Sequence, residues 1–67
     1  MKHFYLQHPE GIAGRRLDSI VTAFTLDYFP RCEAHVIDNK TMLIKAPDSL
    51  YSEAYSAYSD NFICIQT

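Results

Sequence analysis

The sequence predicts a single small α+β domain in which two helices cover one face of a four-stranded antiparallel sheet. Six short segments follow one another with the hydrophobic periodicities strand, helix, strand, strand, helix, strand. This order is the layout of the ferredoxin-like βαββαβ sandwich, for which we expect the strand order 4-1-3-2 across the sheet. The chain of 67 residues suffices for one such domain, over residues 1–67, and contains no linker or internal repeat.

The first strand and the first helix are expected within the first thirty residues. Phe4 and Leu6 alternate with their neighbours over residues 3–7, which predicts a short half-buried strand that stops at the next proline. A helix is expected over residues 14–29, because apolar residues recur there every three or four positions and Pro30 ends the pattern. The stripe expected to face the core is Ala13, Leu17, Ile20, Val21, Phe24 and Tyr28.

A β-hairpin is expected next. Residues 33–38 and 41–46 both alternate in polarity, which predicts the second and third strands. Asn39-Lys40 between them is expected to form a two-residue turn, because Asn tolerates a positive φ.

The last third of the chain predicts a helix and a strand. The helix is expected over residues 49–60, with Asp48 or Ser49 as its N-cap, and the strand over residues 62–66. The residues expected to face the core are Leu50, Ala54 and Ala57 on the helix, and Ile63 and Ile65 on the strand.

The period of two assigns the strand residues to opposite faces of the sheet. The residues expected on the helix side are Phe4, Leu6, Ala34, Val36, Met42, Ile44, Ile63 and Ile65. The open side would then carry Tyr5, His35, Ile37, Leu43, Phe62 and Cys64. That side is more apolar than a solvated face requires, which makes Tyr5, Ile37, Leu43 and Phe62 candidate partner-binding residues. The β-propensity of Ile and Phe is the alternative explanation.

Two helix surfaces add candidates for the same role. Leu26 and Phe29 lie opposite the expected core stripe of the first helix and are expected to be exposed. Tyr51, Tyr55 and Tyr58 line one flank of the second helix. Such a stripe either forms a boundary layer, with rings on the core and hydroxyls in water, or provides an aromatic docking surface.

The segment from Gly11 to Arg16 is the one stretch with a hint of ligand chemistry. Gly11 and Gly14 followed by Arg15 and Arg16 at a helix start could present backbone amides and guanidinium groups to a phosphate. A plain turn is the alternative, because two glycines between a strand and a helix are common for turn reasons alone. A KH domain places its Gly-x-x-Gly loop between two helices, so that resemblance is not adopted.

Composition and charge argue against several classes of function. The net charge of −2 argues against nucleic-acid binding driven by phosphate neutralisation, although a local basic patch could still exist. Cys32 and Cys64 stand apart from any other ligand pair and are expected to be reduced. No stretch approaches the length of a membrane span and the first residues lack a signal-peptide pattern, so we expect a cytoplasmic protein with no membrane contact.

Metal, RNA and catalytic signatures are weak. His3, His8 and His35 share no ligand spacing, and the first loop lacks the paired cysteines of a heavy-metal carrier, so no metal or cofactor is expected. An RNA-recognition motif would carry an aromatic residue on the third strand, where residues 41–46 have none. Catalysis would need a nucleophile and a base converging in a pocket, so we expect no enzyme.

The sequence therefore favours a non-enzymatic protein–protein interaction module. Small regulators and inhibitors, including those encoded by phages and mobile elements, have this profile of an acidic free-standing domain with surplus surface aromatics. The expected partner is another protein or a second copy of the chain. The alternative function is phosphate or nucleic-acid binding through the loop from Gly11 to Arg16.

Overall fold

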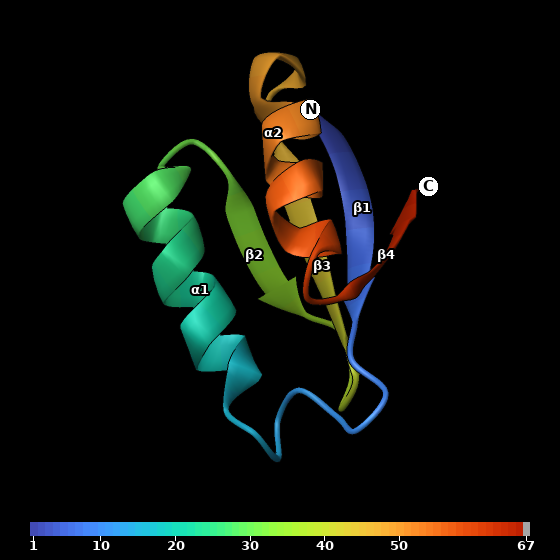
Figure 1. Ribbon diagram of the computed structural model, residues 1–67. Coiled ribbons are helices and arrows are strands. Elements are labelled where there is room, and N and C mark those ends of the chain that lie inside the picture. The colour runs from blue at the N-terminus through green and yellow to red at the C-terminus, as the bar shows by residue number, and fades with distance from the viewer. Residues whose placement is uncertain (67) are drawn as a thin grey trace.

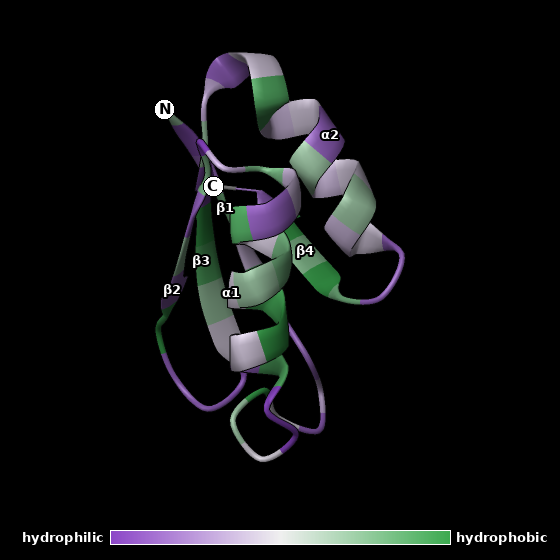
Figure 2. Ribbon diagram, turned by 90° about the vertical axis from the view of Figure 1, so that its left-hand side faces the viewer, coloured by the Kyte–Doolittle hydropathy of each residue, from purple (hydrophilic) through white to green (hydrophobic). Residues whose placement is uncertain are grey.

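A computed structural model describes residues 1–66, and its architecture confirms the predicted α+β class. The elements in chain order are β1 (Lys2–Gln7), α1 (Leu17–Tyr28), β2 (Glu33–Val36), β3 (Thr41–Ala46), α2 (Asp48–Ser59) and β4 (Ile63–Gln66). All strand pairs are antiparallel, and the order across the sheet is β2-β3-β1-β4, which is 4-1-3-2 from the other edge. Both helices lie on the same side of this sheet, and the other face carries no helix (Figures 1 and 2).

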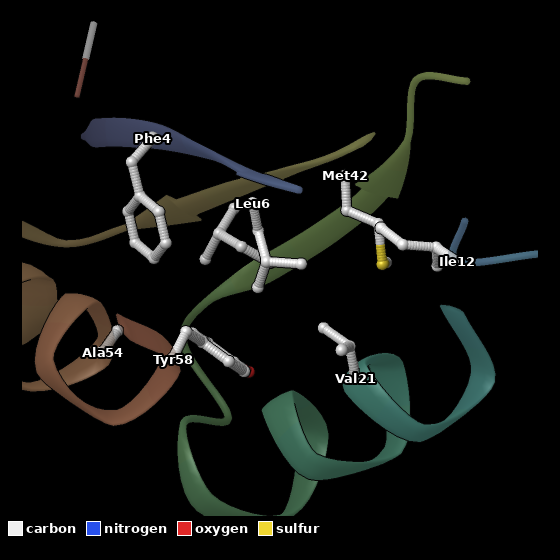
Figure 3. Close-up of a cluster of buried hydrophobic side chains, with 8 residues drawn as sticks. Phe4, Leu6, Ile12, Val21, Met42, Ala54 and Tyr58 are labelled. Atoms are coloured by element: carbon white, nitrogen blue, oxygen red, sulfur yellow. The ribbon is translucent and has the colours of Figure 1, made fainter. Parts of the chain in front are cut away.

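The core lies between the two central strands and the helices. Phe4 and Leu6 of β1 and Met42 and Ile44 of β3 are fully buried, as the alternation predicted. They pack against Val21 of α1 and against Ala54 and Tyr58 of α2, while Ile12 from the β1–α1 loop closes one end (Figure 3).

Helix α1 begins three residues later than the sequence predicted. Arg16 has φ 57° and ψ 26°, in the left-handed region, so the helical geometry cannot extend back to Gly14. The loop before it is tied instead to the β2–β3 hairpin, because the Asn39 carbonyl accepts hydrogen bonds from the amides of Ile12 (2.7 Å) and Ala13 (3.3 Å).

The buried stripe of α1 differs from the predicted one. Val21 and Thr25 are the buried residues of the helix, whereas Ile20 and Tyr28 are 59% and 69% exposed. The predicted stripe was too wide because α1 packs mainly on β2, a single edge strand, and buries a narrow face. Thr25 tolerates burial because its hydroxyl hydrogen-bonds the Tyr58 hydroxyl, a partner that sequence periodicity cannot reveal.

Helix α2 matches its predicted range within one residue but not its predicted cap. Pro47 is the N-cap, and its carbonyl accepts hydrogen bonds from the amides of Leu50 (2.9 Å) and Tyr51 (3.0 Å). Asp48 is the first helical residue, where its carboxylate complements the positive end of the helix dipole. Ala54 and Tyr58 form the buried face, whereas the predicted inner residues Leu50 and Ala57 are half-buried.

The predicted phase of the last strand is wrong by one residue. The pairing of Leu6 with Cys64 places Cys64 on the helix side, and the pairing of Tyr5 with Ile65 places Ile65 on the open side. The turn after α2 decides this phase, because the Tyr58 carbonyl accepts the amide of Phe62 at 3.0 Å and draws Phe62 back toward the core. Ile63 therefore also faces the open side.

The hairpin and the β2 edge also depart from the sequence prediction. Residues 37–40 lie between the paired strands instead of a two-residue turn, and the Asp38 carboxylate caps the loop by accepting the Lys40 amide at 2.8 Å. Val36 pairs with buried Met42 and so faces the helix side as predicted, yet it is 55% exposed. No segment covers it within residues 1–66.

Candidate functional site

The open face of the sheet carries a row of side chains that crosses all four strands. Tyr5 lies directly opposite both Leu43 on β3 and Ile65 on β4, and Leu43 lies opposite His35 on β2. Directly opposed residues of antiparallel strands project to the same face about 5 Å apart, so these side chains are neighbours. Ile63, opposite Gln7, extends the row along β4.

Four of these residues form an apolar surface, which we call the open-face patch: Tyr5, Leu43, Ile63 and Ile65. Ile63 and Ile65 are 51% and 43% exposed, and Tyr5 and Leu43 are half-buried by their neighbours. Of the predicted candidates, Tyr5 and Leu43 belong to this patch. Ile37 lies in the hairpin loop, 53% exposed, beside Thr41 at the end of the sheet.

Charged and polar side chains border one end of the patch. Glu33, Lys45 and His3 lie in one row across β2, β3 and β1. Glu33 also contacts His35, with 3.0 Å between Oε1 and Nε2. An apolar centre with a polar rim is the usual composition of a protein interface.

Phe62 does not belong to the patch. It is half-buried on the helix side, with its ring 6.5 Å from that of Tyr58. The sequence missed Ile63 and Ile65 because residues 62–66 are apolar in both alternating phases, and only the turn from α2 separates the two possibilities.

The tyrosine stripe of α2 packs against the core. Tyr51, Tyr55 and Tyr58 surround Phe4, with ring centroids 5.7, 5.1 and 6.2 Å from its ring. The Tyr55 hydroxyl donates to the Cys64 carbonyl at 3.2 Å. Burial raises the pKa of Tyr58, against a smaller lowering by its hydrogen bond to Thr25. These contacts fit the boundary-layer alternative, because the rings and two of the hydroxyls are engaged within the domain, and docking through this stripe stays a prediction.

The two residues predicted to be exposed on α1, Leu26 and Phe29, differ in their burial. Phe29 is half-buried against the core, with its ring 5.9 Å from that of Phe24 and 6.4 Å from that of Tyr58. It is the C-cap residue with φ −131°, outside the helical region, and this turn in the chain directs it inward. Leu26 is 62% exposed, as predicted.

The loop from Gly11 to Arg16 uses most of its backbone amides within the chain. Four of the six amides of residues 11–16 donate to carbonyl oxygens of the domain, from 2.7 to 3.3 Å. The donors and acceptors are Gly11 to His8, Ile12 and Ala13 to Asn39, and Arg16 to Ala13. Arg15 forms an ion pair with Glu10, although both side chains are more than half exposed. This geometry favours a structural turn, and Gly11 with φ 94° supplies the one position that needs a glycine.

A surface hollow of about 460 Å³ lies at the end of the sheet where the β1–α1 loop meets the hairpin. It is lined by Gln7, His8, Pro9, Asp38, Asn39, Lys40, Thr41 and Ile63. The His8 ring is already engaged, since Nδ1 accepts the Glu10 amide at 3.2 Å. Within residues 1–66, no three His, Cys, Asp or Glu side chains converge as metal ligands.

The two cysteines are free thiols. Burial raises the pKa of Cys32, against a smaller lowering by the charge of Arg31, and burial also raises the pKa of Cys64. A raised pKa keeps the thiol protonated and unreactive near neutral pH, so neither has the character of an activated nucleophile.

Comparison with protein-family models, with curated proteins and with solved structures gave no match. Over residues 1–66, neither helix has the length and apolar character needed to cross a membrane. The function therefore has to be argued from the geometry of the domain alone.

Proposed function

We propose that this protein is a non-enzymatic protein–protein interaction module that binds its partner through the open-face patch. The observation that carries the proposal is the cross-strand cluster of Leu43, Tyr5 and Ile65, extended by Ile63 along β4. Apolar side chains gathered on three adjacent strands exceed the scattered apolar residues of an ordinary surface.

The chemistry of the patch indicates what the partner surface is like. Its apolar centre fits an apolar surface, and the row of Glu33, Lys45 and His3 fits a mixed polar rim. The partner is another protein or a second copy of this chain. A small domain gains stability from either, because binding to the native state adds to its apparent free energy of unfolding.

The proposed role is that of a regulator or inhibitor that acts by occupying a surface of its partner. A domain of 67 residues with a shallow, open hollow has little means of enclosing a substrate. The proposal places the protein in the cytoplasm, in keeping with its two free thiols.

The test replaces the centre of the patch with charges. The double variant Leu43→Lys, Ile65→Glu should lose association while it keeps the far-UV circular dichroism of the wild type. The matched control is Ile20→Lys, Tyr28→Glu, which places the same charges at equally apolar exposed positions on α1. Association is measured by light scattering for self-association, and by capture from host lysate with mass spectrometry for a foreign partner.

The alternative of phosphate or nucleic-acid binding is separated in the same experiment. The variant Arg15→Gln, Arg16→Gln should leave association unchanged, and association through the patch should depend weakly on salt. If the wild-type complex dissociates steeply as the salt concentration rises and is lost in the arginine variant, the binding site is the loop from Gly11 to Arg16 and not the open-face patch. A monomer whose partner binding survives the patch variant would refute the proposal.

A further inference from the structure

The outer edge of β2 presents backbone groups that β3 does not use. The Ile37 amide donates to the Thr41 carbonyl at 2.9 Å, one position beyond the paired residues Val36 and Met42, which makes Val36 and Met42 a non-hydrogen-bonded pair of the antiparallel ladder. Hydrogen-bonded and non-hydrogen-bonded pairs alternate along such a ladder. The N–H and C=O groups of Ala34 and Val36 therefore point away from β3, along the free edge of the sheet. An edge of this kind is a template for another strand.

A groove runs beside this edge, between β2 and α1. Two hollows of about 360 and 210 Å³ lie along it. The first is lined by Asp18, Ser19, Thr22, Ala23, Leu26 and Val36, and the second by Thr22, Thr25, Leu26, Cys32, Glu33, Ala34 and His35. Because Thr22 and Leu26 line both hollows, the two are adjacent, and we call them together the α1–β2 groove.

The two large apolar side chains that line the α1–β2 groove are uncovered. Leu26 is 62% exposed and Val36 is 55% exposed, although Val36 faces the helix side of the sheet. A strand added to this edge would place every second side chain on the same side, beside Ala34 and Val36. The side chain opposite Val36 would enter the first hollow, and the side chain opposite Ala34 would enter the second. The free backbone groups and the groove could therefore hold the same added strand.

The charge of the groove selects among such strands. Asp18 lines the first hollow, and no Lys or Arg is among the residues that line either. Glu33 lines the second hollow, but its carboxylate contacts His35 on the open face. An extended segment that carries a Lys or Arg next to the apolar residue in the first hollow would place a positive charge near the Asp18 carboxylate.

We propose that the α1–β2 groove binds an extended peptide segment of a partner protein, which joins the sheet as a fifth strand beside β2. The segment has apolar side chains at alternate positions and a basic residue at one flank. Main-chain hydrogen bonds to Ala34 and Val36 supply affinity, and the two hollows supply specificity.

A peptide segment fits this edge better than a second copy of the chain. Helix α1 stands outside β2 on the helix side of the sheet (Figures 1 and 2). If two β2 edges paired, each copy would bring its own α1 into the space beside the joint, where the other α1 already lies. An extended segment without a helix of its own avoids this conflict.

The experiment selects ligands from a phage-displayed library of random heptapeptides on the immobilised wild-type protein. We expect enrichment of peptides with alternating apolar residues and a flanking Lys or Arg. The affinity of the enriched peptide, synthesised with a fluorescent label, is then measured for variants by anisotropy. Leu26→Lys should weaken binding by about tenfold or more, whereas the matched control Ile20→Lys, on the same helix outside the groove, should leave it unchanged.

The backbone contribution is tested by Ala34→Pro, which removes an outward N–H but no hydrogen bond to β3. This variant should also weaken binding of the selected peptide. If it does not fold, amide hydrogen exchange of the wild type gives the same information, because the bound peptide should slow exchange at Ala34 and Val36.

Three outcomes would overturn the proposal. They are a library without enrichment, peptides whose binding survives Leu26→Lys, and exchange protection confined to the open-face patch. Self-association that Leu26→Lys abolishes would assign the groove to a second copy instead.

Discussion

The two helices cover the sheet to different degrees, and this difference divides the molecule into a closed half and an open half. Helix α2 lies over the central strands, where Phe4 and Ile44 are fully buried. Helix α1 lies over the edge strand β2, where Val36 and Leu26 remain more than half exposed. The closed half supplies stability, and the open half supplies surfaces that another chain can cover.

The side chains of the two helices explain the contrast. The tyrosines of α2 are long enough to surround Phe4, and the hydroxyls of Tyr55 and Tyr58 reach partners at the margin of the core. Helix α1 contributes Val21 and Thr25 to the buried layer, and both are too small to extend over β2. A buried hydrogen bond between the hydroxyls of Thr25 and Tyr58 joins the two helices (Figure 3 shows Tyr58 reaching toward α1).

The largest expected effect is in the centre of the closed half. Phe4→Ala should cost about 3–5 kcal/mol, because Phe4 is fully buried among three tyrosine rings. A single core of this size supplies about the same amount, so the variant should be largely unfolded at 25 °C by circular dichroism. Leu26→Ala in the open half is the control and should change the free energy of unfolding by less than about 0.5 kcal/mol. Equal effects at both positions would remove the distinction between the halves.

A second comparison lies within one cross-strand pair. Met42 and Val36 face each other on the same side of the sheet, but Met42 is fully buried and Val36 is 55% exposed. Met42→Ala should cost about 2–5 kcal/mol. Val36→Ala should cost about 0.5 kcal/mol, because half of its surface already contacts water. Urea denaturation of both variants measures the difference, and a large loss for Val36→Ala would mean that β2 is covered in solution.

The hydrogen bond between the helices should have a smaller effect. Thr25→Val keeps the shape of the side chain but leaves the buried Tyr58 hydroxyl without its partner, at a cost of about 1–3 kcal/mol. Tyr58→Phe should cost a similar amount. The double variant should cost less than the sum of the two single changes, as measured by a double-mutant cycle with chemical denaturation. Strict additivity would contradict a direct bond between these hydroxyls.

The smallest effect is a dependence of stability on alkaline pH. Burial raises the pKa of Tyr58 above its ordinary value of 10.0, so between the two pKa values the unfolded chain loses a proton that the native state retains. The native state then binds more protons, and the free energy of unfolding falls as pH rises through 10 toward the folded pKa. Below pH 10 this contribution is fully present.

The measurement compares the melting temperature of wild type and Tyr58→Phe across this range. The melting temperature of the variant should fall less steeply than that of the wild type above pH 10. Cys32 and Cys64 contribute in the same direction from their ordinary value of 9.0, because burial raises both pKa values. The thiol contribution is common to both proteins, so identical slopes would argue against burial of the Tyr58 hydroxyl.

The predicted elements were more reliable than the predicted faces. The alternation of Phe4 with Leu6 and of Met42 with Ile44 sufficed to place the central strands, because each has one clearly apolar phase. In β4 both phases are apolar, so the turn that returns Phe62 to the core decides which residues point outward. The candidate site was therefore half predicted: Tyr5 and Leu43 came from the alternation, and Ile63 and Ile65 required the register.

The sequence by itself determined the order of the six elements, their approximate limits and the identity of the central core, because these follow from local periodicity and from prolines at the element ends. Only the tertiary structure decided how much of each helix is covered. Burial depends on what lies opposite, and periodicity cannot show that α1 rests on an edge strand while α2 rests on the centre of the sheet. For the same reason only the structure could show that the tyrosines enclose Phe4 and that Val36 borders an open groove.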